Sequence, residues 1–184
     1  MTIPGPWATL TADEKRSRVL DVADELFARD GVDVPMPVLA DRLGVGVGSI
    51  YRQVGSKDDL IAHLVAARAR ALRERFLATL DEPDPWAALV AATHATVDDC
   101  LRDALSQTAW DEAALVSEEV RDARLGATEA LEAMVERARA AGALRDDADH
   151  EDLRLVFCAL RELAGIGPRA AHRLAELVLR GMEA

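Results

Sequence analysis

Apolar residues recur along most of this 184-residue chain at spacings of three and four, which places them on one face of an α-helix. Half of the residues are hydrophobic but only 4% are aromatic, so the core must consist mainly of Ala, Leu and Val. That composition favours closely packed helices over a sheet. The pattern therefore predicts an all-α protein of about nine helices.

Helix boundaries follow from local signals. Thr11 with Glu14, and Ser56 with Asp59, form two capping boxes that predict helix starts. The second box opens a long helix, which we expect to end near Leu80. Later helices are expected from about Trp86 to Ala104, from Thr108 through Trp110, from Ser117 to Ala141, from Asp149, and after the Gly165–Pro168 break.

The stretch from 39 to 60 contains two short predicted helices joined by a glycine turn. Gly44 ends the first helix, because glycine enters the left-handed conformation without a Cβ clash. In the second helix Ile50 and Val54 form an apolar side, and polar residues occupy the opposite side. Such a pair, with a polar second helix after a glycine turn, is typical of a helix-turn-helix unit whose second helix enters the DNA major groove.

The charge distribution limits the kind of nucleic-acid binding. The net charge of −11 argues against a general nucleic-acid coat, and even residues 1–60 have seven Lys or Arg against ten Asp or Glu. Residues 42–57, however, contain three basic residues and no acidic one. We therefore expect DNA binding through a local positive face, with modest affinity and marked salt sensitivity.

Residues 19–65 resemble the DNA-binding domain of TetR-type bacterial transcriptional regulators, over about a quarter of the chain. The residues that carry the resemblance are Ala23, Leu26, Phe27, Gly31, Leu39, Ala40, Gly44, Val45, Gly48, Ile50, Tyr51, Arg52, Ser56, Lys57 and Leu60. The resemblance implies a helix-turn-helix DNA-binding domain in residues 1–58 and a helical ligand-binding and dimerisation domain in residues 59–184. It also implies a homodimer that binds double-stranded operator DNA and a small-molecule effector. Repressor is the default role, since the family also contains activators.

The expected DNA contacts lie on or beside the second helix of the motif. Arg52 can hydrogen-bond to guanine, Gln53 to adenine, and Ser49 to either base. The resemblance implies a phosphate contact for Tyr51, although a half-buried packing role is the alternative. Lys57 stands in the first turn of the next helix, where the helix N-terminus favours a phosphate. The predicted DNA-binding residues are Arg42, Val47, Gly48, Ser49, Tyr51, Arg52, Gln53 and Lys57.

Polar residues interrupt the apolar stripes of the body. Thr93 lies in the middle of one stripe, and His94 lies at its edge with Asp98 four residues later. One interpretation is a ligand pocket. The alternative is that the Thr93 hydroxyl bonds its own helix while His94 and Asp98 form an exposed pair. The predicted pocket residues are Phe76, Trp86, Thr93, His94, Trp110 and Met134.

The last two predicted helices are apolar over more than a narrow stripe and carry small residues that allow close approach. The resemblance implies that they form a four-helix bundle with a second copy, and the alternative is a core pair within one protomer. We favour the dimer because a single head has too few contacts for specific DNA binding. The expected interface residues are Leu153, Phe157, Leu160, Leu174, Leu177 and Val178.

Other functions find little support. The sequence has no nucleophile–base motif, phosphate loop or metal-ligand spacing, so we expect no enzyme, cofactor or metal. Without an apolar run of about 20 residues or a secretion signal, a cytoplasmic protein with buried free Cys100 and Cys158 is expected. The competing hypothesis is a helical ligand- or protein-binding module with a vestigial DNA-binding head. Its support is the acidic head, Gly46 in place of the usual capping serine, and the prolines around Met36.

Overall fold

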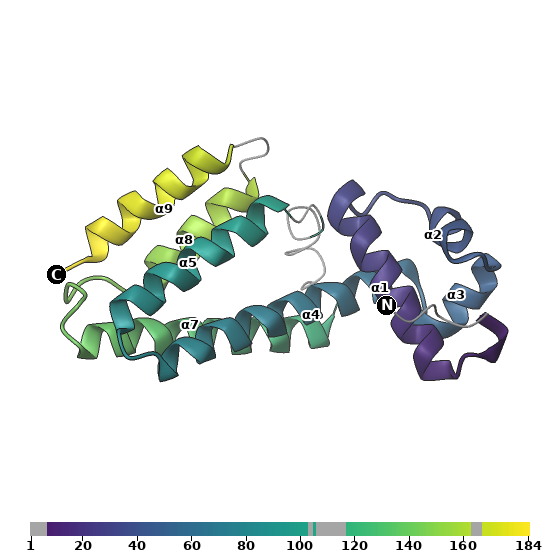
Figure 1. Ribbon diagram of the computed structural model, residues 1–184, viewed down its shortest axis with the longest axis horizontal. Helices are drawn as coiled ribbons and strands as arrows, with labels where there is room; N and C mark the ends of the chain where they lie inside the picture. Colours follow the sequence, from purple (N-terminus) through teal and green to yellow (C-terminus); the bar gives the residue numbers. More distant parts are fainter. Residues whose placement is uncertain (1–6, 103–104, 106–116, 163–166) are drawn as a thin grey trace.

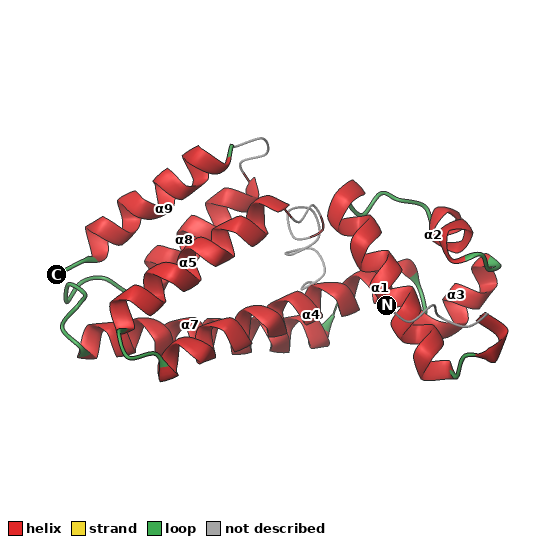
Figure 2. Cartoon of the chain, in the orientation of Figure 1, coloured by secondary structure: helices red, strands yellow, loops and turns green. Residues whose placement is uncertain are grey.

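The computed structural model describes residues 7–102, 105, 117–162 and 167–184, and these residues form helices and connecting loops without a β-sheet (Figure 2). The described part contains α1 (Ala12–Asp30), α2 (Met36–Leu43), α3 (Val47–Val54), α4 (Lys57–Ala78), α5 (Pro85–Arg102), α7 (Glu118–Ala140), α8 (His150–Glu162) and α9 (Pro168–Met182), with short 3₁₀ turns at Trp7–Thr9 and Thr79–Asp81. The all-α prediction is confirmed. The helix expected to open at Thr108 and to include Trp110 lies outside the described residues.

The first three helices form a compact head, from which α4 leads into the body (Figure 1). Their apolar faces meet in one core, so the head packs around residues of all three helices and the start of α4. Its buried members include Val19, Leu26, Phe27, Leu39, Ile50 and Leu60. This core fixes the direction in which α3 presents its outer face.

The predicted helix ends are present in the head. The Thr11 hydroxyl accepts from the Glu14 amide at 3.2 Å, and the Glu14 carboxylate accepts from the Thr11 amide at 2.7 Å. Ser56 and Asp59 make the same reciprocal pair at 3.1 and 2.8 Å. Gly44 has a φ of +68°, in the left-handed region that glycine favours, and it ends α2. Local chemistry therefore sets where these helices begin and end.

In the body, helices α4 and α7 run side by side, α5 and α8 pack against them, and α9 packs against α5 and α8 (Figure 1). The rings of Phe76 and Phe157 stack with centroids 6.4 Å apart in the centre of this core. Around them lie buried aliphatic residues, among them Leu89, Leu131, Leu153 and Leu160.

The head core continues past the predicted boundary between residues 58 and 59. Leu60, Leu64 and Val65 of α4 belong to it, and so does Val120 in the first turn of α7. The amino-terminal half of α4 and the start of α7 are therefore packing partners of the head. None of the described helices is both long enough and apolar enough to cross a membrane.

Two threonines one turn apart on α5 differ in hydrogen bonding. Thr96 donates to the Ala92 carbonyl at 2.8 Å, which is the common bond of a threonine to its own helix. Thr93 is fully buried, and its hydroxyl has no hydrogen-bond partner. The alternative interpretation of Thr93 as a hydroxyl bonded to its own helix was therefore wrong, because that role belongs to Thr96.

We expect Thr93→Val to raise the free energy of unfolding by about 1 kcal/mol, because it removes a buried hydroxyl that has lost its water and gained no partner. Thr96→Val is the matched control and should lower it by about the same amount, since it removes a made bond. Urea unfolding followed by circular dichroism measures both. Equal destabilisation by the two substitutions would contradict the assignment.

Candidate nucleic-acid interface and ligand cavity

Helix α3 is buried on one side and open on the other. Ile50 and Val54 have exposed fractions of 0% and 2%, and they anchor the helix in the head core. Beside this buried side, Tyr51 is 46% exposed and Val47 37% exposed. On the opposite side of the helix Gly48 and Arg52 are exposed and Ser49 is partly exposed, and Gln53 at the edge is partly exposed. This face is free to meet a groove.

A hydrogen bond between two side chains fixes the position of Arg52 on the exposed side of α3. Arg52 donates from Nη2 to the Ser49 hydroxyl at 2.9 Å, so its guanidinium lies along the helix surface. The Arg52 Nη1 atom lies 3.8 Å from the point where a Cβ on Gly48 would stand. Gly46 precedes the helix without a side-chain cap, as the sequence indicated. No side chain caps the first amides of α3; the Ser49 amide donates to the Gly46 carbonyl at 2.8 Å, and the amides before it are available to an acceptor outside the chain.

The other predicted contacts flank α3. Arg42 is exposed in the last turn of α2, and Lys57 is partly exposed in the first turn of α4. Val38 of α2 is 44% exposed and was not singled out from the sequence. Its position outside the apolar stripe of Leu39 and Leu43 was the available signal.

A cavity of about 1120 Å³ lies where the head meets the body. Its walls come from α1, α4, α5, α7 and α8. Apolar side chains, including Leu72, Phe76, Leu131 and Phe157, form part of the lining. Small residues on α4, Ala67 and Ala71, leave room beside them and are exposed. The cavity can therefore receive an organic molecule with an apolar part.

Charged side chains line this cavity. The body helices contribute five arginines and the carboxylate of Asp99, whereas α1 contributes only carboxylates, namely Asp21, Asp24 and Glu25; the arginines are Arg68, Arg75, Arg102, Arg124 and Arg154. Arg68 joins the two walls by an ion pair with Asp24 at 2.6 Å. Arg75 pairs with Asp99 at 2.6 Å within the body.

The predicted pocket residues are not gathered around this cavity. Phe76 lines it, but Trp86, Thr93, His94 and Met134 lie outside its lining, and Trp110 is outside the described residues. Met134 and Thr93 are instead fully buried in the body. The arginines of α4 and α7 could not be found from the sequence, because no residue near them in the chain marks them as neighbours of α1.

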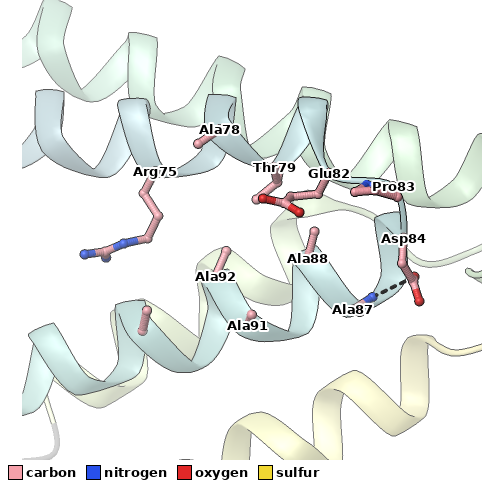
Figure 3. Close-up of a pocket in the computed structure, with 11 residues that line it drawn as sticks. Arg75, Ala78, Thr79, Glu82, Pro83, Asp84, Ala87, Ala88, Ala91 and Ala92 are labelled. Atoms are coloured by element: carbon pink, nitrogen blue, oxygen red, sulfur yellow. Dashed lines mark hydrogen bonds between the residues drawn. The ribbon is translucent and has the colours of Figure 1, made fainter.

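A smaller cavity of about 630 Å³ lies at the far end of the body, between the end of α4 and the start of α5 (Figure 3). Alanines of α5, among them Ala88 and Ala91, face it. Asp84 accepts from the Ala87 amide at 3.0 Å and so fixes the start of α5. Arg75 lines both cavities.

The expected direct pair of His94 with Asp98 is not formed, because His172 of α9 lies between them. The two Nδ1 atoms of His94 and His172 are 2.8 Å apart, and His172 Nε2 is 2.9 Å from Asp98 Oδ1. The hydrogen bond from His172 holds the pKa of the Asp98 carboxyl below its usual range. These residues tie α5 to α9 at the surface.

The predicted interface residues fall into two groups. Leu153, Phe157 and Leu160 of α8 are buried inside one protomer, with exposed fractions of 4% or less, so they serve its own core. Leu177 of α9 is 52% exposed, and Leu174 and Val178 are partly exposed. On α8 the outward apolar residue is Leu155, which is 60% exposed. On α8, therefore, Leu155 replaces Leu153, Phe157 and Leu160 as the candidate interface residue.

The cysteines and metal-ligand groups add no second site. Cys100 is buried, as expected, whereas Cys158 is partly exposed, against the expectation. Within the described ranges, no group of three or more His, Cys, Asp or Glu residues is placed to hold a metal ion.

Two family models match this chain. Residues 19–64 match the model for bacterial regulatory proteins of the tetR family, and residues 84–184 match the model for the SbtR-like transcriptional regulator C-terminal domain. The second match covers more than half of the chain. Together they span the head with α3 and most of the body.

Individual relatives agree with these matches. Over 55 residues the chain is 36% identical to HTH-type transcriptional regulators of Staphylococcus aureus, a match that spans 29% of this chain and only 30% of those relatives. A TetR transcriptional regulator from Streptomyces coelicolor superposes with a TM-score of 0.69 at 27% identity, over 91% of this chain and 98% of that one. A transcriptional regulator from Saccharomonospora viridis, solved with choline, has a TM-score of 0.71 at 19% identity, over 94% and 99% of the two chains, which shows a shared fold.

Proposed function

The chain belongs to the TetR family of bacterial transcriptional regulators, and we propose that it is a homodimeric repressor that releases operator DNA when a small molecule binds its body. DNA binding and regulation of transcription follow from the family. The repressor role, the effector and the dimer are the proposal. It acts on operator DNA in the cytoplasm.

The observation that carries the proposal is the exposed face of α3 opposite its buried anchors. Arg52, Ser49 and Tyr51 lie on or beside that face, and Lys57 begins the next helix. Base edges in the major groove accept the hydrogen bonds that an arginine donates. Two such heads in one dimer would reach successive major grooves, about 34–36 Å apart.

The α8–α9 face, defined by Leu155, Leu174, Leu177 and Val178, supports a dimer. These side chains are exposed or partly exposed and apolar, and they come from neighbouring helices. A second copy that packs its own α8–α9 face here would bury all of them in a symmetric contact. The twofold axis would then set the separation of the two heads.

The junction cavity, which is the cavity of about 1120 Å³ where the head meets the body, is the proposed effector site. It combines apolar lining with arginines, and one wall is α1 of the head, so an occupant would bear directly on the head. The regulator of the same fold that was solved with choline supports a small organic ligand for this architecture. The ligand must bind the DNA-free state more tightly, and a 100-fold release needs about 2.7 kcal/mol of coupling.

Arg52→Ala and Tyr51→Ala should each weaken operator binding by about tenfold or more, since each removes a direct contact to base or phosphate. Lys57→Ala should weaken binding on every sequence and lower the salt slope by about one. Fluorescence anisotropy with duplex DNA from beside the protein's own gene measures all three. Arg145→Ala, at the far end of the body, is the control. Wild-type protein that shows no salt-dependent binding would instead favour the vestigial-head hypothesis.

Leu155→Glu combined with Leu177→Glu should convert the dimer to a monomer, because the change buries charges in an apolar contact. Sedimentation equilibrium measures the mass, and operator affinity should fall with it. Leu125→Glu on α7 is the matched control, since Leu125 is as exposed as Leu155, at 60%. A dimer that survives the double substitution would place the interface elsewhere.

Ala71→Trp should fill the junction cavity and weaken binding of 1-anilinonaphthalene-8-sulfonate, an amphipathic anion suited to apolar and arginine side chains. Ala91→Trp, in the smaller cavity, is the matched control and should bind the dye like wild type. A fluorescence titration of folded protein gives both affinities. Equal loss of dye binding in both variants would argue against the junction cavity as the ligand site.

A further inference from the structure

A chain of hydrogen bonds connects the last turn of α3 to the first turn of α7. Arg16 of α1 donates from Nη1 to the Gln53 carbonyl at 2.7 Å, and its Nη2 lies 2.8 Å from His63 Nε2. On the other side of the ring, His63 Nδ1 lies 2.8 Å from Glu119 Oε2. Four helices thus meet through three side chains and one carbonyl.

The chemistry of Arg16 fixes the protonation of His63. A guanidinium only donates, so His63 Nε2 must accept and cannot carry a proton. The neutral ring then carries its proton on Nδ1, which faces the Glu119 carboxylate and can donate to it. The chain is therefore continuous only when His63 is neutral and in this one tautomer.

Glu119 is held as an anion at the end of the chain. Its Oε1 accepts from Arg70 at 2.5 Å. Burial acts to raise the pKa of Glu119, but the hydrogen bonds from Arg70 and His63 and the charge of Arg70 outweigh burial, so the pKa lies below its ordinary value. Glu119 therefore remains an acceptor for the His63 proton throughout the neutral range.

Apolar packing reinforces the same connection. Val120, which follows Glu119, has an exposed fraction of 0% and belongs to the head core, as does Leu64, which follows His63. At the other end Gln53 lies in the last turn of α3, where carbonyls lack partners within the helix. Arg16 satisfies one of these carbonyls and so fixes α3 against α1.

We propose that Arg16, His63 and Glu119 are positioning residues through which the body holds the recognition helix α3 in its DNA-binding orientation. The inference rests on the proposed function and adds its regulation. Movement of α7 away from α4 breaks the contact between Glu119 and His63, and protonation of His63 breaks the contact between His63 and Arg16. Either event removes a contact that holds the Arg16 side chain in place at the Gln53 carbonyl. His63 also lines the junction cavity, so an effector there meets the chain at its middle residue.

Charged groups on three helices surround the His63 ring and act on its protonation in opposite directions. Arg16 on α1 opposes a charge on His63, whereas Glu119 on α7 and Asp59 one turn earlier on α4 favour it. Across the cavity α1 also presents Asp24, which is paired with Arg68. A protonated ring would turn an Nε2–H donor toward the guanidinium donor, so the Arg16 contact cannot persist in place.

The direction of the pH effect separates this inference from general electrostatics. Acidification makes a protein of net charge −11 less negative, which by itself strengthens DNA binding. Loss of the Arg16–His63 contact acts in the opposite direction. At each pH, the operator affinity of wild type is divided by that of His63→Gln. We expect this ratio to fall about tenfold between pH 8 and pH 5.5, at constant ionic strength.

The variants isolate the ring nitrogen. His63→Gln keeps an acceptor near the position of Nε2 and cannot be protonated, so it should bind operator like wild type at pH 8 and lose the relative decrease at pH 5.5. His63→Leu has no acceptor and should bind about tenfold more weakly at both pH values. His150→Gln, on α8, is the control and should keep the wild-type profile. Parallel pH profiles for wild type and His63→Gln, or full affinity in His63→Leu at pH 8, would overturn the proposal.

A measurement on the free protein keeps the test independent of DNA binding. Nitrogen-15 NMR of the histidine rings at pH 8 should show His63 protonated on Nδ1 alone, and amide exchange in α3 should accelerate when His63 is protonated. A ring protonated on Nε2, or α3 exchange that ignores the protonation of His63, would overturn the inference. If no DNA bound under any condition, the proposed function would fail while these NMR results still decided the positioning role.

Discussion

The burial of Ile50 and Val54 beneath α1 is the contact on which the DNA-binding surface depends. An eight-residue helix is far too short to be stable alone in water, so α3 exists because its apolar side is held by the head. Gly46 gives it no side-chain cap, and Arg16 secures its last turn. The outward direction of Arg52 is therefore a property of the head core as much as of α3 itself.

Features set by neighbouring residues could be predicted from the sequence. The capping boxes at Thr11 and Ser56, the glycine turn at Gly44 and the two sides of α3 each depend on residues within about four positions, and the structure contains all of them. The all-α architecture follows similarly, because each helix carries its own apolar stripe. For these features the determining contacts lie within one helix or one turn, and sequence pattern and structure agree.

Features set by distant residues could not be predicted. His172 separates His94 from Asp98 although it lies more than 70 positions away, and Asp24 meets Arg68 across the head–body junction. The apolar positions of α8 gave no sign of which would face inward, so Leu153 and Phe157 were assigned to an interface that Leu155 is better placed to form. Pattern alone cannot distinguish a buried face from one awaiting a partner.

The position of Val120 in the head core has a consequence for how such proteins recombine. A head cut from the chain after residue 58 would leave behind Leu60, Leu64 and Val120, which complete its core. Grafting a foreign head onto this body therefore requires matching apolar surfaces on α4 and α7 as well as a compatible joint. The unit to be exchanged is larger than the stretch proposed to contact DNA, because its core includes a residue of a helix separated from that stretch by some 60 residues.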